Sequence, residues 1–294
     1  MKAAIIGPGF IGTELAGQLT LAGHEVVLMG RSPRPNHIPF LELDVLREKI
    51  TLPKNIDAVF YLAQSPHYRE FPKHAGDLFG VNTLGAIKTA EAALDSGCRF
   101  FFHASTGNVY SPSFSALSEH ERTEAEGAYA LSKRMAEQAL LLFSGPMSVC
   151  VGRIFGAFGP GQKNMLPALI RERLLKREAI QLAPHPINGP DGGLRVSYIY
   201  NPDLGRILTG LAEKALSGEN VPRLLNLGGP EAVSLERLAL EMGKALNVAP
   251  VFEHTGSARK FDLAADITLL RQTLHPSFTP LGEALKVAAG SAAQ

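Results

Sequence analysis

Short, continuous apolar runs alternate with helical segments along the first half of the chain. Runs rich in Val, Ile, Leu and Phe predict strands at 3–6, 25–29, 40–45, 57–63, 99–104 and 147–153. Apolar positions three and four residues apart predict helices at about 78–94 and 125–143. Because strands that are buried on both faces read as continuous apolar runs, this pattern predicts a doubly wound, mostly parallel α/β sheet with helices on both faces.

The pattern changes after about residue 152, where glycine and proline become frequent. A helix at about 165–177, strands at 194–199 and 224–227, and a helix that ends at 246 interrupt this region, and Ser234 is a good N-cap for the last helix. Residues 1–165 are therefore expected to form the sheet domain, with the segment 195–228 returning to it. The remaining parts of 166–294 are expected to form a small C-terminal lobe.

The first strand leads directly into a glycine-rich turn. Gly7, Gly9 and Gly12 form a G-x-G-x-x-G string, and the apolar positions that follow have a helical spacing. In such a turn the first glycine permits the reversal, the second lets the backbone approach a pyrophosphate, and the third lets helix and strand pack closely. The N-terminus of the helix also favours phosphate charge. The context predicts a Rossmann-type, dinucleotide-binding domain, and hence a substrate-binding role for the C-terminal lobe.

Composition and charge exclude several other classes of function. The chain has 294 residues, of which 29 are basic and 28 acidic, so no nucleic-acid or membrane-surface partner is indicated. Cys98 and Cys150 lie in apolar surroundings, which favours buried thiols in a reducing compartment, and no signal or membrane segment is visible. A cytoplasmic location is therefore expected. His103, His185 and His275 lack metal-ligand spacing, and no metal site is expected.

Tyr129 and Lys133 are candidates for proton transfer. They are four residues apart in the predicted helix 125–143, so their side chains share one face. A tyrosine has a reference pKa of about 10, which a nearby ammonium lowers by favouring the phenolate. We therefore expect Lys133 to lower the pKa of Tyr129 and make it a usable general acid and base.

Hydroxyl side chains follow the fifth predicted strand. Ser105 and Thr106 stand where this strand ends, and ligands in open α/β sheets bind beyond the carboxyl ends of the strands. Either hydroxyl could hold the oxygen of a substrate carbonyl. The alternative is that they cap a loop, as Ser and Thr commonly do.

Taken in order, the motifs resemble those of the extended short-chain dehydrogenase/reductase family, the NAD(P)-dependent epimerases and dehydratases that act largely on nucleotide sugars. The matching pieces run over nearly the whole length: GPGFIG, LELDV, VFYLAQ, VNTLGAIKTAEAALDSG, FFHASTGNVY, YALSK, GRIFGAFGPGQ and LLNLGGPEAVSLERLA. The resemblance implies that Tyr129 is the catalytic acid/base, that Lys133 also bonds the nicotinamide ribose, and that Thr106, with Ser105 beside it, is the catalytic hydroxyl. Asn82 matches an asparagine that completes a proton relay in related enzymes.

The resemblance also implies a set of cofactor-binding residues. Phe10 and Ile11 lie within the glycine turn, Asp44 and Val45 match the pair beside the adenine, and Ala63 matches the strand end that lines the cofactor. Ile6 departs from the family pattern, because a glycine usually stands three positions before Gly9. The resemblance therefore implies an atypical member of the family.

The end of the second predicted strand is a further departure. The acidic residue that would bind the adenosine ribose is replaced by Gly30, followed by Arg31 and Arg34. An acid would repel a 2′-phosphate, whereas an arginine fork binds one with charge-assisted hydrogen bonds. NADP is therefore expected as the cofactor in preference to NAD.

Three functions remain open from the sequence. The first is hydride transfer at a carbinol or carbonyl of a substrate such as a nucleotide sugar, although Arg195 lies one position from the register of the family's phosphate-binding arginine. The second is NADPH-dependent reduction of a small carbonyl compound. The third is an NADP-sensing regulatory protein without catalysis. Related enzymes often pair through the helices that carry Asn82 and Tyr129, so a homodimer is expected.

Overall fold

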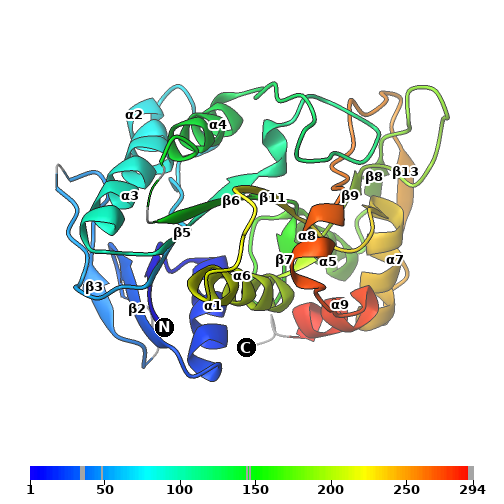
Figure 1. The fold of residues 1–294 in the computed structure, drawn as a ribbon. Coiled ribbons are helices and arrows are strands. Elements are labelled where there is room, and N and C mark those ends of the chain that lie inside the picture. The colour runs from blue at the N-terminus through cyan, green and yellow to red at the C-terminus, as the bar shows by residue number, and fades with distance from the viewer. Residues whose placement is uncertain (34–36, 48, 144, 146, 291–294) are drawn as a thin grey trace.

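The central feature of the computed structural model is a seven-stranded sheet in which all neighbouring strands are parallel. The structure describes residues 1–33, 37–47, 49–143, 145 and 147–290. The strand order is β11-β6-β5-β4-β1-β2-β3, which confirms the predicted doubly wound, Rossmann-type sheet (Figure 1). The strands are β1 (Lys2–Ile6), β2 (Glu25–Gly30), β3 (Phe40–Glu42), β4 (Ala58–Tyr61), β5 (Phe100–Thr106), β6 (Ser148–Ile154) and β11 (Leu224–Leu227).

Helices cover both faces of this sheet. On one face lie α1 (Phe10–Leu21) and α6 (Asn201–Leu216), and on the other lie α3 (Gly85–Asp95) and α4 (Ala128–Leu140) (Figure 1). The strands in the middle of the sheet are buried on both sides; every residue of β5, for example, is buried. This double burial explains why the sequence shows continuous apolar runs instead of alternation.

The helix predicted at 78–94 is divided into three parts. It consists of α2 (Ala75–Phe79), a π-helical turn η1 (Gly80–Leu84) and α3. The buried hydroxyl of Tyr61, on β4, donates a hydrogen bond of 2.6 Å to the carbonyl oxygen of Val81 in this turn. A side chain that bonds a helix carbonyl disturbs the regular ladder, and π-turns of this kind are frequent at functional sites.

The C-terminal lobe has its own hydrophobic core. It is built from α5 (Leu166–Lys176), α7 (Leu235–Leu246) and α9 (Leu281–Gly290), with the small parallel pair β8 (Ile180–Leu182) and β13 (Phe252–His254). The Oγ of Ser234 accepts a hydrogen bond from the backbone N–H of Arg237, so Ser234 is the N-cap of α7, as expected. The predicted strand 194–199 forms two short pieces, β9 (Arg195–Val196) and β10 (Ile199–Tyr200), which pair with β12 (Val233–Ser234) and β7 (Ala157–Phe158).

One segment assigned to the lobe from the sequence packs elsewhere. In α8 (Thr268–Leu274), Leu270 belongs to the core beneath α1 and α6, together with the preceding Ile267. Part of the C-terminal sequence therefore packs against the sheet domain and not against the lobe. Among the described residues, no helix has the length and apolar character needed to cross a membrane.

Candidate active site

The glycine turn between β1 and α1 has the geometry of a phosphate cradle. Gly7 has φ +91°, and a Cβ there would lie 2.5 Å from the backbone of Ala63, so a side chain is excluded both by conformation and by space. A Cβ on Gly12 would lie 2.6 Å from the carbonyl oxygen of Gly7. By contrast, a Cβ on Gly9 would meet nothing within 4 Å, because Gly9 faces open space.

Helix α1 begins at this open point without a side-chain cap. Gly9 is its N-cap, and no acidic residue occupies the first turn. The first amides of a helix have no partners within the helix, and they favour negative charge. The cradle therefore fits the pyrophosphate of a dinucleotide, as the glycine spacing predicts.

A cleft of about 780 Å³ extends from this turn along the carboxyl ends of the strands. The residues expected to bind the cofactor all line it: Gly7, Gly9, Phe10, Ile11, Gly12, Arg31, Asp44, Val45, Ala63 and Lys133. At the end of β2, a Cβ on Gly30 would lie 2.9 Å from Cδ of Pro8, so a larger residue has little room there. Arg31 is exposed at the rim, and Arg34 lies outside the described residues.

Tyr129, Lys133 and Thr106 meet in the wall of the same cleft. The buried Nζ of Lys133 donates a hydrogen bond of 2.9 Å to the carbonyl oxygen of Ala104, and the hydroxyl of Tyr129 donates one of 3.2 Å to Oε1 of Gln64. Helix α4 thus delivers two groups, one turn apart, to the end of β5. The proton-transfer pair and the strand-end hydroxyl expected from the sequence are brought together.

The electrostatics of the pair differ from the expectation. Burial raises the pKa of Tyr129 to about 12, although a hydrogen bond with Thr106 acts in the opposite direction. Burial also lowers the pKa of Lys133 to about 8, while the carboxylate of Glu137 opposes this change. Burial therefore outweighs the expected effect of the ammonium on Tyr129 in this structure, because both groups lose solvation. At neutral pH the phenol is protonated, which suits a proton donor.

Ser105 and Asn82 have other partners. Oγ of Ser105 donates to Glu137, whose buried carboxylate also accepts hydrogen bonds from Arg153 at 3.0 and 2.7 Å. Asn82 accepts a hydrogen bond from the backbone N–H of Ser65 and donates one to Oγ of Ser132. Ser105 still lines the cleft, whereas Asn82 does not. Asn82 supports the start of α4, and its part in a proton relay stays a prediction.

The segment between β4 and α2 contributes residues that the sequence analysis did not single out. Gln64, Tyr68 and Arg69 line the cleft, and the rings of Tyr68 and Tyr129 are 5.2 Å apart. The signal that could have found them is their position directly after β4, at the same edge of the sheet as the other site residues.

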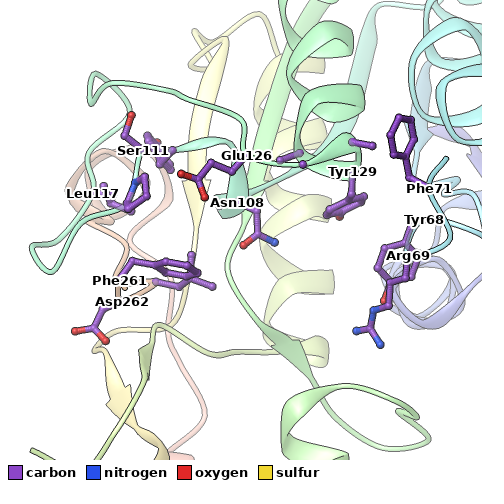
Figure 2. Close-up of a pocket in the computed structure, with 17 residues that line it drawn as sticks. Tyr68, Arg69, Phe71, Asn108, Ser111, Leu117, Glu126, Tyr129, Phe261 and Asp262 are labelled. Atoms are coloured by element: carbon purple, nitrogen blue, oxygen red, sulfur yellow. The ribbon is translucent and has the colours of Figure 1, made fainter. Parts of the chain in front are cut away.

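A second cavity, of about 490 Å³, adjoins the cleft at Tyr129. Figure 2 shows Tyr129 with Tyr68, Arg69 and Phe71 on one side of this cavity and Leu117, Phe261 and Asp262 on the opposite side. The lobe side of the main cleft carries Tyr198, whose buried hydroxyl has no hydrogen-bond partner among the described residues. The chain thus provides space for a substrate beside the hydroxyl of Tyr129.

Cations are sparse in these cavities. Within the described part of the chain, the basic side chains that line them are Arg31, Arg69 and Lys133. Arg195, considered as a phosphate ligand because of its sequence position, lines neither cavity. Among the described residues, Arg69 is therefore the arginine that lines the smaller cavity together with Tyr129.

Comparison with known proteins shows the family to which the glycine turn and the Tyr129–Lys133 pair belong. The model of the NAD dependent epimerase/dehydratase family matches residues 4–228. A UDP-N-acetyl-alpha-D-glucosaminuronate decarboxylase from Bacillus cytotoxicus is 25% identical over 254 residues, which are 80% of this chain and 77% of that protein. UDP-glucuronic acid decarboxylase 1 from Xenopus tropicalis is 26% identical over 79% of this chain, but the match spans only 57% of that protein.

A solved structure is similar over almost the whole chain. MoeE5 in complex with UDP-glucuronic acid and NAD superposes with a TM-score of 0.79 and is 26% identical, and the match covers 99% of both chains. The family model matches the glycine turn, the Tyr129–Lys133 pair and all of the parallel sheet except the first two residues of β1. The chain therefore belongs to the NAD-dependent epimerase/dehydratase family, a family of Rossmann-type enzymes.

Proposed function

We propose that this protein catalyses hydride transfer at a secondary alcohol or carbonyl of a nucleotide sugar. The observation that carries the proposal is the meeting of Tyr129, Thr106 and Lys133 between the phosphate cradle and the cavity of about 490 Å³. The relatives are UDP-sugar enzymes by name, and MoeE5 binds UDP-glucuronic acid. We place the reacting carbon of the substrate beside the hydroxyl of Tyr129.

The chain's own groups handle the proton and the oxygen. The nicotinamide cofactor supplies the hydride chemistry when it is bound. Tyr129 gives a proton to the substrate oxygen during reduction and removes it during oxidation, while the hydroxyl of Thr106 donates a hydrogen bond to the same oxygen. Lys133 is held by the carbonyl of Ala104, at a distance of 2.9 Å, in a position that lines the cofactor cleft. Thr106 and Lys133 thus orient the reacting groups without changing their own covalent state.

Arg69 supports an acidic sugar as the substrate. A guanidinium matches the geometry of a carboxylate or a phosphate, and Arg69 shares the smaller cavity with Tyr129. The names of the relatives refer to uronic acids, which carry a carboxylate on the sugar ring. A UDP-hexuronic acid is therefore the substrate that we would test first, with the neutral UDP-hexose as its matched comparison.

We further propose that the cofactor is NADP(H), although MoeE5 binds NAD. Gly30 leaves no carboxylate at the end of β2, and Arg31 stands exposed beside it at the rim of the cleft. A hydrogen bond to a charged group contributes about 1.5–3 kcal/mol, so Arg31 would favour NADPH by roughly tenfold or more.

Titration of the protein with NADPH and NADH tests this preference. Arg31→Ala is expected to weaken NADPH binding about tenfold and to leave NADH binding nearly unchanged. Arg237→Ala, an exposed arginine on α7, is the matched control and should change neither. Equal affinities for the two cofactors, or an Arg31→Ala variant that binds NADPH like the wild type, would show that NADP is not preferred.

A reductase and a sensor are the two other candidate functions, and measuring the nicotinamide absorbance together with product formation distinguishes them from a redox-neutral enzyme. A redox-neutral enzyme converts a nucleotide sugar while the absorbance of the nicotinamide is unchanged after turnover. An NADPH-dependent reductase of a small carbonyl compound consumes NADPH, and the scarcity of cations around the smaller cavity favours this second candidate. A sensor without catalysis would bind the cofactor tightly and convert no substrate, and the presence of both Tyr129 and Lys133 at the cleft argues against it.

We also propose a homodimer that pairs through α4 and η1. Leu84, Leu131 and Met135 are large apolar residues of these elements with exposed fractions of 56%, 44% and 44%. Sedimentation equilibrium measures the mass directly, and a monomer at micromolar concentration would contradict the proposal. A cytoplasmic location stays a prediction.

A further inference from the structure

Three potential metal ligands gather on the segment between β4 and α2, beside the active-site cleft. Nδ1 of His67 lies 3.1 Å from Oε1 of Glu70, and Nε2 of His74 lies 3.3 Å from Oε2 of the same carboxylate. The two imidazole rings are stacked, with centroids 4.0 Å apart. One ligand atom from each residue can be chosen so that all three lie within 4.8 Å of one another.

The chemistry of this triad suits a divalent transition metal. Two imidazoles and one carboxylate are a common ligand set for Zn²⁺, which takes three protein ligands and a water in open sites. All three side chains are partly or fully exposed, so an ion can enter from solvent.

We propose that His67, Glu70 and His74 form a binding site for Zn²⁺ or a similar divalent transition metal. The site departs from the expectation of no metal, which considered histidines that are far apart in the sequence. Here the spacing is three and four residues, which brings the ligands together within a single segment. The inference does not rest on the proposed catalytic function.

The proposed metal site lies in the same segment as two residues that line the cleft. Tyr68 and Arg69 lie between the first two ligands in the sequence, and both line the cleft and the smaller cavity (Figure 2). At its start the segment is held through Ser65, which bonds Asp77 and the backbone N–H of His67. A metal ion would add a second attachment that joins residue 67 to residue 74. Metal binding is therefore expected to order the part of the wall that faces the substrate.

Calorimetric titration of the purified full chain with Zn²⁺ alone tests the site. We expect saturable binding of one ion per chain, and His67→Gln and His74→Gln should each weaken it at least tenfold, because each removes one of three ligands. His254→Gln, an exposed histidine on β13, is the control and should bind like the wild type. Far-ultraviolet circular dichroism shows whether each variant is folded.

Limited digestion with trypsin supplies a second readout. The bonds after Arg69 and Lys73 lie inside the proposed chelate, so Zn²⁺ should slow their cleavage several-fold in the wild type but not in His74→Gln. Co²⁺ in place of Zn²⁺ should give a visible spectrum of nitrogen and oxygen ligation that the variants lack.

Either of two results would overturn the proposal. One is the absence of saturable one-to-one binding in the wild type. The other is equal Zn²⁺ affinity in His67→Gln, His74→Gln and the wild type, which would place any bound ion elsewhere and leave the triad as a hydrogen-bonded surface cluster.

Discussion

Because Lys133 is buried, its contribution to the free energy of unfolding changes with pH in the alkaline range, and the size of this change can be calculated. The side chain is 2% exposed, and burial lowers its pKa from 10.5 to about 8. The unfolded chain therefore binds this proton more tightly than the folded chain between these pH values. The contribution of Lys133 to stability is therefore largest above pH 10.5 and is lost as the pH falls towards 8, at about 1.36 kcal/mol per pH unit.

Lys133→Met isolates this contribution, since methionine has a similar length and does not titrate. The free energy of unfolding in urea is measured for the wild type and the variant at pH 7 and pH 10 without cofactor. The difference, wild type minus variant, should rise by about 2.5 kcal/mol between these pH values, because other titrating groups cancel. The loss of the hydrogen bond to Ala104 shifts the difference at every pH equally. A difference that stays constant within about 0.5 kcal/mol would refute the argument that burial disfavours the ammonium.

Two further experiments test the buried ion pair beside the site and the glycine turn. Glu137→Gln leaves the buried Arg153 without its carboxylate and should destabilise the fold by about 3–5 kcal/mol in urea unfolding. The control Glu231→Gln breaks the exposed ion pair with Arg237 and should destabilise the fold by less than about 1 kcal/mol. Equal losses of stability in the two variants would contradict this account. Gly12→Ala places a Cβ 2.6 Å from the carbonyl oxygen of Gly7 and should weaken dinucleotide binding at least tenfold by fluorescence titration, whereas unchanged affinity would show that the turn does not hold the cofactor.

The sheet could be predicted because its strands are buried on both faces. In β5 and β6 this burial imposes continuous apolar sequence, and the order of strands and helices along the chain then admits few arrangements. The glycine turn could also be predicted, because backbone atoms lie so close to Gly7 and Gly12 that no side chain fits at either position. The spacing of Tyr129 and Lys133 fixes their common face before any tertiary contact is known.

The remaining features depend on contacts between distant parts of the chain. Helix α6 is absent from the elements predicted from the sequence, although Leu204, Leu208 and Leu211 have helical spacing. The raised pKa of Tyr129 results from burial, which no local pattern reveals. The segment 64–74 has no strong periodicity, so its approach to Tyr129 becomes visible only in the fold.

The most direct test of the account is the turnover of Tyr129→Phe on the first nucleotide sugar that the wild type converts. The substitution keeps the ring beside Tyr68 and removes only the hydroxyl that bonds Gln64. The affinity for the dinucleotide should be unchanged, and kcat should fall by about 10²–10⁴-fold, the usual contribution of general acid–base catalysis. A variant that binds the cofactor normally and keeps more than about a tenth of the wild-type kcat would contradict the assignment of Tyr129 as the proton-transfer group.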